Sequence, residues 1–274
     1  MKINRVNIAF YSATGNTEKV VRVIGMNLAR GLGVPAEMSD FTLPGSRSAV
    51  RSYGPGDLTV VGVPVYAGRI PNKILPYIQQ GLKGNGALAV PAVTFGNRNY
   101  DDGLAELRDE LECRGFHTVA GAAVACAHAF SDKIAAGRPD EEDMAGLARF
   151  CDDVVRKIKE LSSVPDSVSV RGNSPAGPYY TPLGQDGRPA SFLKARPRTA
   201  PDRCDGCGLC ARVCPMGAIP ADAPDTVTGI CIKCQACVRR CPRTAKYFDD
   251  GPFLSHVAML EVNYTRRAES EWFV

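Results

Sequence analysis

The sequence predicts an α/β chain in which a doubly wound domain is followed by a smaller cysteine-rich unit. Three observations support this prediction. Strand-like and helix-like segments alternate over residues 1–161, a stretch rich in proline and glycine covers residues 162–200, and eight of the 11 cysteines lie between positions 204 and 241. A chain of 274 residues also exceeds the usual size of one domain, so two domains are expected.

The first 161 residues contain five apolar runs separated by helical stretches. The expected strands are residues 6–11, 34–39, 58–65, 87–95 and 117–126, and the expected helices are residues 17–32, 71–81, 103–114 and 139–161. A further short helix is expected at residues 47–53. Regular alternation favours parallel pairing with right-handed crossovers, and therefore a three-layer domain.

The remaining residues are expected to form two further parts. Six prolines interrupt residues 162–200 and a seventh, Pro201, follows directly, which predicts a linker that can lie extended along a domain surface. The cysteine unit is assigned to residues 201–274, with a final helix at about residues 252–271.

Charge and hydropathy exclude several function classes. The net charge of +4 arises mainly in residues 162–200, and no basic face with interleaved aromatic residues is seen, so nucleic acid is not an expected partner. No apolar run is long enough to span a membrane, and the first residues lack a leader pattern. We therefore expect a cytoplasmic protein.

The eight clustered cysteines form two copies of C-x2-C-x2-C-x3-C-P, which begin at Cys204 and Cys231. This spacing is typical of [4Fe–4S] binding, in which the fourth cysteine of each run ligates the other cluster. The crossed ligand sets are Cys204, Cys207, Cys210 and Cys241 for one cluster, and Cys231, Cys234, Cys237 and Cys214 for the other. Paired zinc sites are the alternative, but two complete runs followed by proline favour iron.

The segment FYSATGNT, residues 10–17, joins the first strand to the first helix. It lacks the lysine of a P-loop and the glycines of a dinucleotide fingerprint. Its hydroxyl groups, its glycine and the free N–H groups of a helix start favour a phosphate monoester. The candidate binding residues are Ser12, Thr14, Gly15, Asn16 and Thr17. The alternative is a capped helix without a ligand.

Two resemblances follow from these motifs. Residues 200–248 resemble the bacterial two-cluster ferredoxins, and residues 1–160 resemble the flavodoxins, whose ligand is FMN and whose parallel strands follow the order 2-1-3-4-5. Two further loops, PVYAGRIPN (64–72) and TFGNRNYDD (94–102), match flavodoxin loops that flank the flavin ring. The whole chain resembles the flavodoxin–ferredoxin fusion flavoproteins of anaerobes.

The flavodoxin resemblance implies roles for residues in these two loops. Tyr66 is expected on one face of the ring, and Tyr100 or Phe95 on the other, with core packing the alternative for Phe95 and surface exposure for Tyr100. Gly68 and Gly96 would let the backbone approach the flavin. The remaining candidate cofactor contacts are Pro64, Val65, Ala67, Thr94, Asn97 and Asp101.

The predicted function is electron transfer between two [4Fe–4S] clusters and FMN, which can link one-electron to two-electron redox partners. The first alternative is an FMN-dependent reductase of a small acceptor that uses the clusters as an internal wire, and the second is a redox sensor. The sequence assigns no catalytic residue and does not identify the redox protein partner. Of the three histidines, only His128 follows a strand at the ligand-binding edge.

Overall fold

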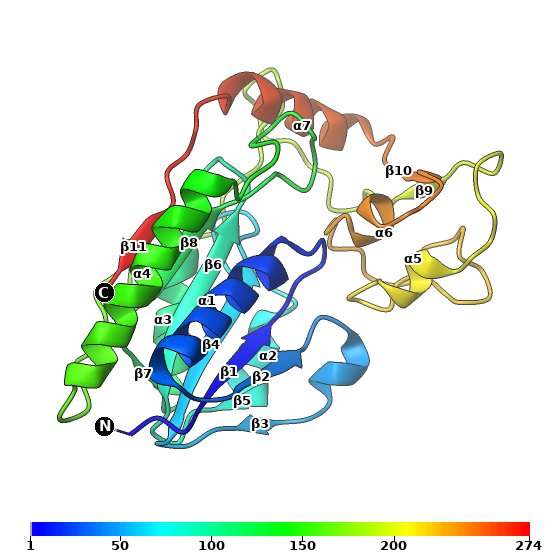
Figure 1. Cartoon of the computed structure of the whole chain (residues 1–274). Helices are drawn as coiled ribbons and strands as arrows, with labels where there is room; N and C mark the ends of the chain where they lie inside the picture. The colour runs from blue at the N-terminus through cyan, green and yellow to red at the C-terminus, as the bar shows by residue number, and fades with distance from the viewer. Residues whose placement is uncertain (1) are drawn as a thin grey trace.

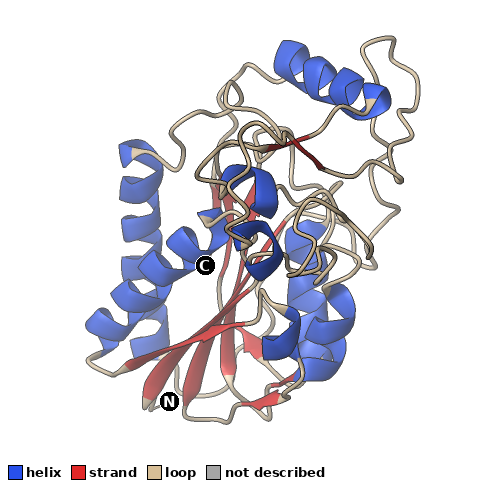
Figure 2. Cartoon of the chain, turned by 90° about the vertical axis from the view of Figure 1, so that its right-hand side faces the viewer, coloured by secondary structure: helices blue, strands red, loops and turns tan. Residues whose placement is uncertain are grey.

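A single seven-stranded sheet with helices on both faces forms the main body of the molecule (Figures 1 and 2). The structure is a computed structural model that describes residues 2–274. Five strands run parallel in the spatial order β2 (Ala36–Asp40), β1 (Arg5–Phe10), β4 (Asp57–Pro64), β6 (Leu88–Phe95) and β8 (Gly121–Ala125). The predicted order 2-1-3-4-5 is therefore observed.

The short strands depart from the prediction. The fifth expected strand is divided into β7 (His117–Thr118) and β8, which both pair with β6. The short helix expected at residues 47–53 is replaced by a single 3-10 turn, Pro44–Arg47, and by β3 (Arg51–Ser52), which pairs with β5 (Leu82–Lys83). Pro44 sets the backbone for such a turn, but the following residues pair with a neighbouring segment instead of continuing as a helix.

Two helices cover each face of the sheet. The helices α1 (Asn16–Leu32) and α4 (Glu141–Glu160) share one core with the sheet, and α2 (Leu75–Gly81) and α3 (Gly103–Cys113) pack on the opposite face. A close approach between α1 and β4 depends on Gly62, because a Cβ atom there would lie 2.2 Å from Val21 Cγ1. The three-layer prediction is thus confirmed.

The C-terminal segment corrects the predicted domain boundary. The helix α7 (Gly251–Asn263) ends well before residue 271, and the chain then returns to the sheet as β11 (Glu271–Phe273), antiparallel to β8. The side chain of Trp272 stacks on Phe150 of α4, with ring centroids 5.5 Å apart. The last residues therefore belong to the sheet and not to the cysteine unit.

The proline-rich stretch lies on the body of the protein as an ordered strap. Asp102 accepts hydrogen bonds from the amides of Asn173 and Gly177, both at 2.8 Å. Farther along, the Tyr180 amide donates to Ala67 O at 2.8 Å. The strap therefore passes over the loop that follows β4.

The cysteine unit lies beyond the carboxyl ends of the parallel strands, beside the start of α1 (Figure 1). It contains the one-turn helices α5 (Leu209–Arg212) and α6 (Ala236–Arg239), and a two-stranded ribbon of β9 (Arg198–Thr199) and β10 (Lys246–Tyr247). Ala236 and Cys234 pack in the same apolar core as Tyr11 and Phe41 of the sheet domain. The two parts thus share a core.

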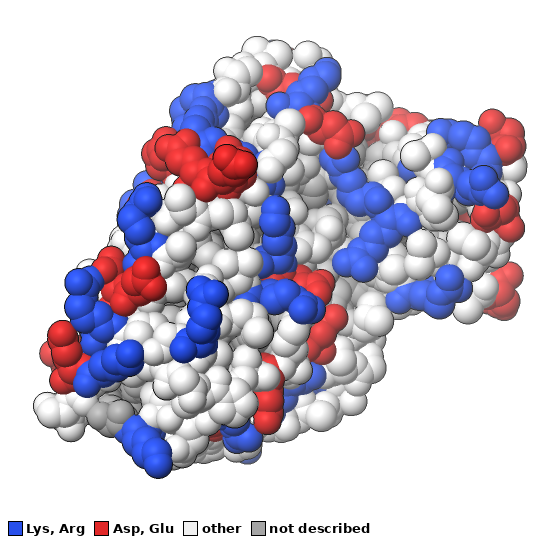
Figure 3. Space-filling model, in the orientation of Figure 1, with Lys and Arg blue, Asp and Glu red and all other residues white. Residues whose placement is uncertain are grey.

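The surface carries both signs of charge. Figure 3 shows lysine and arginine side chains interspersed with aspartate and glutamate over the face drawn. No helix in residues 2–274 has the length and apolar character needed to span a membrane.

The substitution Trp272→Ala tests the contribution of the returning strand. Loss of the contact between the partly buried Trp272 indole and Phe150 should lower the free energy of unfolding by about 2 kcal/mol. The midpoint of unfolding, followed by circular dichroism because Trp272 is the only tryptophan, provides the measurement. Val274→Ala, at an exposed position, is the control. Equal midpoints for both variants would contradict a structural role for β11.

Candidate functional site

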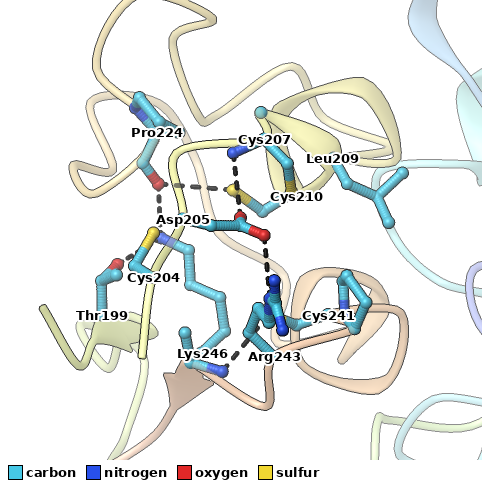
Figure 4. A pocket seen from close by; sticks show the side chains of 13 residues that line it. Thr199, Cys204, Asp205, Cys207, Leu209, Cys210, Pro224, Cys241, Arg243 and Lys246 are labelled. Atoms are coloured by element: carbon cyan, nitrogen blue, oxygen red, sulfur yellow. Dashed lines mark hydrogen bonds and ion pairs between the residues drawn. The ribbon is translucent and has the colours of Figure 1, made fainter. Parts of the chain in front are cut away.

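A first cavity of about 330 Å³, counting its open mouth, is lined by cysteines of both cysteine runs (Figure 4). Its cysteines are Cys204, Cys207, Cys210 and Cys241. Cys207 is exposed, so this cavity borders solvent. An ion pair at 3.0 Å between Arg243 and Asp205 joins the two runs at its edge.

A second cavity, of about 370 Å³, is lined by the other four cysteines of the two runs. They are Cys214, Cys231, Cys234 and Cys237. Its other walls are largely apolar and include Ile219, Ile230 and Phe248. Each cavity thus combines three cysteines from one run with the fourth cysteine of the other. Within residues 2–274, no three His, Cys, Asp or Glu side chains converge closely enough to hold a single metal ion.

The two cysteine runs have the same backbone conformation. Gly206 and Gly208 have positive φ in the first run, and Lys233 and Gln235, 27 positions later, have positive φ in the second. The amides of Ala218 and Ala245 each donate to a cysteine sulfur at 3.3 Å, Cys214 Sγ and Cys241 Sγ respectively. These turns direct backbone N–H groups toward sulfur, as thiolate ligands require.

The cysteines of the second cavity are partly buried. Burial raises the pKa of Cys234 and of Cys237 to about 12. The thiolate form therefore needs a cation to offset the loss of hydration. A cluster that carries iron meets this requirement, so the donor set and its surroundings fit such a group.

The loop before α1 presents a row of free amides. Gly15 has φ +101° and gives the helix no side-chain cap. Among the described residues, no hydrogen-bond acceptor lies opposite the backbone N–H groups of residues 13–17. Since the start of a 17-residue helix also carries a partial positive charge, these amides form an anion site.

Three of the predicted phosphate-loop side chains hold the loop in place. Ser12 Oγ accepts from Glu18 N at 3.1 Å, Thr17 Oγ1 lies 2.7 Å from Thr94 Oγ1, and Asn16 Nδ2 donates to Ala127 O at 2.9 Å. Thr14 is partly exposed, and its hydroxyl has no partner in the described part of the chain. Thr14 is therefore the side chain of this loop that is free to bind a ligand.

The loop after β4 lies between the sheet and the cysteine unit. Pro64 ends β4 opposite Thr94, and the Val65 amide donates to Thr94 O at 2.8 Å. Burial, followed by the neighbouring Tyr11 and Cys234, raises the pKa of Tyr66 well above its usual value. Tyr66 is therefore a neighbour of both Tyr11 and Cys234.

Gly68 and Gly96 both face protein groups in this structure. A Cβ atom at Gly68 would lie 2.3 Å from Asp101 Oδ2, and one at Gly96 would lie 2.3 Å from His128 Cδ2. Asp101 in turn pairs with Arg98. The close approach expected at each glycine is therefore made by a side chain of this chain.

The loop after β6 corrects the expectation for Tyr100. Its ring is fully buried against Phe95, with centroids 5.3 Å apart, and is not exposed as the alternative expected. The Tyr100 hydroxyl donates to Glu271 at 2.8 Å and accepts from Arg171 at 2.9 Å. Held in this way by β11 and the strap, Tyr100 has no free face for a flavin ring.

Asn97 also has a different role from the one expected. Its Nδ2 donates to Tyr264 O and Arg266 O at 2.8 and 2.6 Å, and its Oδ1 accepts from Ala268 N at 3.0 Å. The side chain therefore binds the C-terminal segment and is not a free neighbour of a cofactor.

Two arginines that no sequence pattern indicated, Arg47 and Arg239, join the sheet domain to the cysteine unit. Arg47 donates to Pro215 O at 2.5 Å, and Arg239 donates to Ala129 O at 2.8 Å. Their acceptors are main-chain carbonyls distant in sequence, and such contacts leave no pattern in the residue types.

His128 lies in the loop between β8 and α4, beside the phosphate loop. Its Nδ1 accepts from Phe130 N at 3.1 Å, which places the proton on Nε2. Burial lowers the pKa of His128 to about 4. Nε2–H therefore remains a neutral donor at neutral pH.

This shift predicts a pH-dependent contribution to stability. Between pH 6.5 and about 4 only the unfolded chain binds the proton, so the contribution of His128 to stability falls as the pH falls. Relative to His128→Asn, the wild type should lose about 2 kcal/mol of unfolding free energy between pH 7 and pH 5. Urea unfolding at each pH measures this difference, with His117→Asn as the control. Parallel pH profiles for wild type and His128→Asn would contradict the assignment.

Comparisons with known proteins assign the cysteine unit. The family model "4Fe-4S binding domain" matches residues 198–219, and a second model of the same description matches residues 228–247. A search of curated proteins found no match.

Several solved structures are similar to the sheet domain. An archaeal flavodoxin is 12% identical, with 57% of this chain and 99% of that chain covered and a TM-score of 0.41. The rubredoxin oxygen:oxidoreductase of Desulfovibrio gigas is 19% identical over 58% of this chain and 37% of that chain, with a TM-score of 0.41. An NADH:FMN oxidoreductase is 15% identical over 60% and 95%, with a TM-score of 0.42.

The strand order of the sheet and the two matched segments lead to the same architecture. An open parallel sheet in the order 2-1-3-4-5 is the flavodoxin-like arrangement. The chain therefore combines a domain of flavodoxin-like fold with two segments that match 4Fe-4S binding domains.

Proposed function

We propose that the protein is an electron-transfer flavoprotein that binds FMN and two [4Fe–4S] clusters. The observation that carries this proposal is the shared core, in which Cys234 of the second four-cysteine cavity packs with Tyr11 and Ala13 of the loop before α1. Sites for one-electron groups and an anion site thus belong to one folded body.

Each cavity is proposed to hold one cluster through its four cysteines. The first set is Cys204, Cys207, Cys210 and Cys241, and the second is Cys214, Cys231, Cys234 and Cys237. A bound cluster supplies reversible storage of single electrons. The protein contributes thiolates, amide donors such as those of Ala218 and Ala245, and apolar walls.

The FMN phosphate is proposed to bind the amides of residues 13–17 and the Thr14 hydroxyl. The donor set fits a phosphate monoester, because it combines free N–H groups and a helix start. Tyr66 and Gly68 remain the proposed ring neighbours after β4, and the second ring face is left without an assigned aromatic residue. Bound FMN can exchange one or two electrons at a time.

Coverage of the loops favours an electron carrier over the alternative of a small-molecule reductase. The strap binds Ala67 through the Tyr180 amide, and the C-terminal segment binds Asn97. Both loops expected beside the flavin ring are thus covered by protein. Electrons can reach a covered group through neighbouring clusters, whereas a small substrate needs an open approach.

Cofactor analysis of anaerobically reconstituted protein tests the proposal. We expect about eight iron atoms and one FMN per chain, together with electron paramagnetic resonance signals of reduced clusters. Rapid mixing with dithionite should show electrons passing from the clusters to the flavin. Iron without FMN would contradict the flavin assignment, and protein without iron would contradict the whole proposal.

The substitution Thr14→Ala tests the phosphate site separately. Loss of one hydrogen bond to a charged phosphate should weaken FMN binding about tenfold, while the iron content stays unchanged. Fluorescence titration of flavin-free protein with FMN measures the affinity. Ser163→Ala, on the exposed strap, is the matched control. Equal affinities for the two variants would place the phosphate elsewhere.

A further inference from the structure

The second cavity is fastened to the flavodoxin-like domain by two arginines, one from each side of the interface. Arg47, after β2, donates through Nη2 to Pro215 O at 2.5 Å, and Pro215 directly follows the ligand candidate Cys214. Its Nη1 donates to Phe41 O at 3.0 Å and to Thr42 O at 2.5 Å. The same guanidinium therefore joins the segment after β2 to a segment that lines the second cavity.

Arg239 makes the complementary contact from the cysteine unit. It lies on α6, two positions after Cys237, and donates through Nε to Ala129 O at 2.8 Å and through Nη2 to His128 O at 3.3 Å. Its remaining terminal nitrogen pairs with Asp132. Three acceptors of one loop are thus held by a single planar guanidinium, a geometry that an ammonium group cannot reproduce.

Both arginines reach the phosphate loop through one further hydrogen bond. Thr42, bound by Arg47, accepts from Ser12 N through its hydroxyl at 2.8 Å. Ala127, in the loop bound by Arg239, accepts from Asn16 Nδ2 at 2.9 Å. The second cavity is therefore tied to both ends of the proposed phosphate site.

Within residues 2–274, the first cavity has no comparable attachment. Its charged neighbours pair within the cysteine unit, as Arg243 does with Asp205, and Cys207 is exposed. The apolar core shared with the flavodoxin-like domain includes Cys234 and Ile232, which line the second cavity. The second cavity is thus attached to the flavodoxin-like domain, and the first cavity borders solvent.

We propose that Arg47 and Arg239 are positioning residues that hold the cluster of the second cavity against the flavin site. This cluster then exchanges electrons directly with the flavin, and the cluster of the first cavity receives them from an external one-electron donor. The inference rests on the proposed function. In each internal transfer the cluster loses one electron and the flavin gains it. Two transfers reduce the flavin, which takes its protons from solvent, and the donor reduces the clusters again.

The test compares Arg239→Lys, Arg47→Lys and the double variant with the wild type, all loaded with both cofactors. Lysine keeps the charge but loses the fork that serves several carbonyl groups. Arg240→Lys is the matched control, because Arg240 is exposed, adjacent, and without a side-chain partner in residues 2–274.

After rapid mixing with dithionite, cluster reduction should be unchanged in all variants. Flavin reduction should slow about tenfold in each single variant, which corresponds to about 1.4 kcal/mol of lost docking, and further in the double variant. Dithionite also reduces the flavin directly in the wild type and in every variant. This direct reaction sets the lowest rate of flavin reduction that can be observed. Hydrogen exchange should also quicken at residues 127–133 in Arg239→Lys, and at residues 41–47 in Arg47→Lys.

The outcomes separate this inference from the proposed function. If the fully loaded variants reduce the flavin and exchange amide hydrogens at wild-type rates, the positioning role is overturned. The proposed electron-transfer function would not be affected by that result. Slower flavin reduction in Arg240→Lys of the same size would also overturn it. A wild-type chain that binds no iron or no FMN overturns both.

Discussion

The pairing of β11 with β8 is the interaction on which the arrangement of the two parts depends. It returns the chain to the sheet after the cysteine unit, so that this unit is attached to the flavodoxin-like domain at both of its ends. A buried ion pair fixes the return, because Arg138 binds Asp143 of α4 and also donates to Ala268 O. Since removal of one partner would leave a buried charge, this contact opposes detachment of the segment.

Attachment at both of its ends keeps the cysteine unit close to the flavodoxin-like domain. A domain on one flexible linker samples many positions, whereas a unit held at both ends is confined near its partner. The strap adds to this confinement through Asp102, and α7 packs its Phe253 against Phe130 and Phe248. The shared core around Cys234 follows from this confinement. Two separate proteins must meet by diffusion, whereas these two parts belong to one chain and share a core.

Sequence patterns predicted the parts of the molecule that arise from local or repeated features. Alternating runs gave the parallel strands and their covering helices, and cysteine spacing gave the two groups of four that line the cavities. The patterns could not predict β11, because three residues carry no periodicity and pair only with a strand distant in the sequence. Tyr100 was misplaced for the same reason, since Glu271 and Arg171 hold it from segments outside its own loop.

The two cysteine runs reach one backbone conformation by different means. The first run places glycine at its positive-φ positions, Gly206, Gly208 and Gly217. The second has Lys233, Gln235 and Thr244 at the equivalent positions, each of which costs about 1 kcal/mol or more in this region. Such residues persist only where their surroundings determine the conformation, and Gln235 is buried at the interface side of the unit, beside the core residue Ala236.

The first run can therefore adopt its turns through the freedom of glycine, next to solvent. The second lies against the flavodoxin-like domain, which holds it through the shared core around Ala236 and through the contact of Arg239 with Ala129 O. The backbone geometry of the second run is consequently linked to the docking of the cysteine unit on the flavodoxin-like domain. Because Gln235 lies beside the core residue Ala236, a change that loosens the interface also releases backbone strain in the second run, whereas the first run, which Arg47 binds at Pro215 O, has glycine at the matching positions and stores no such strain.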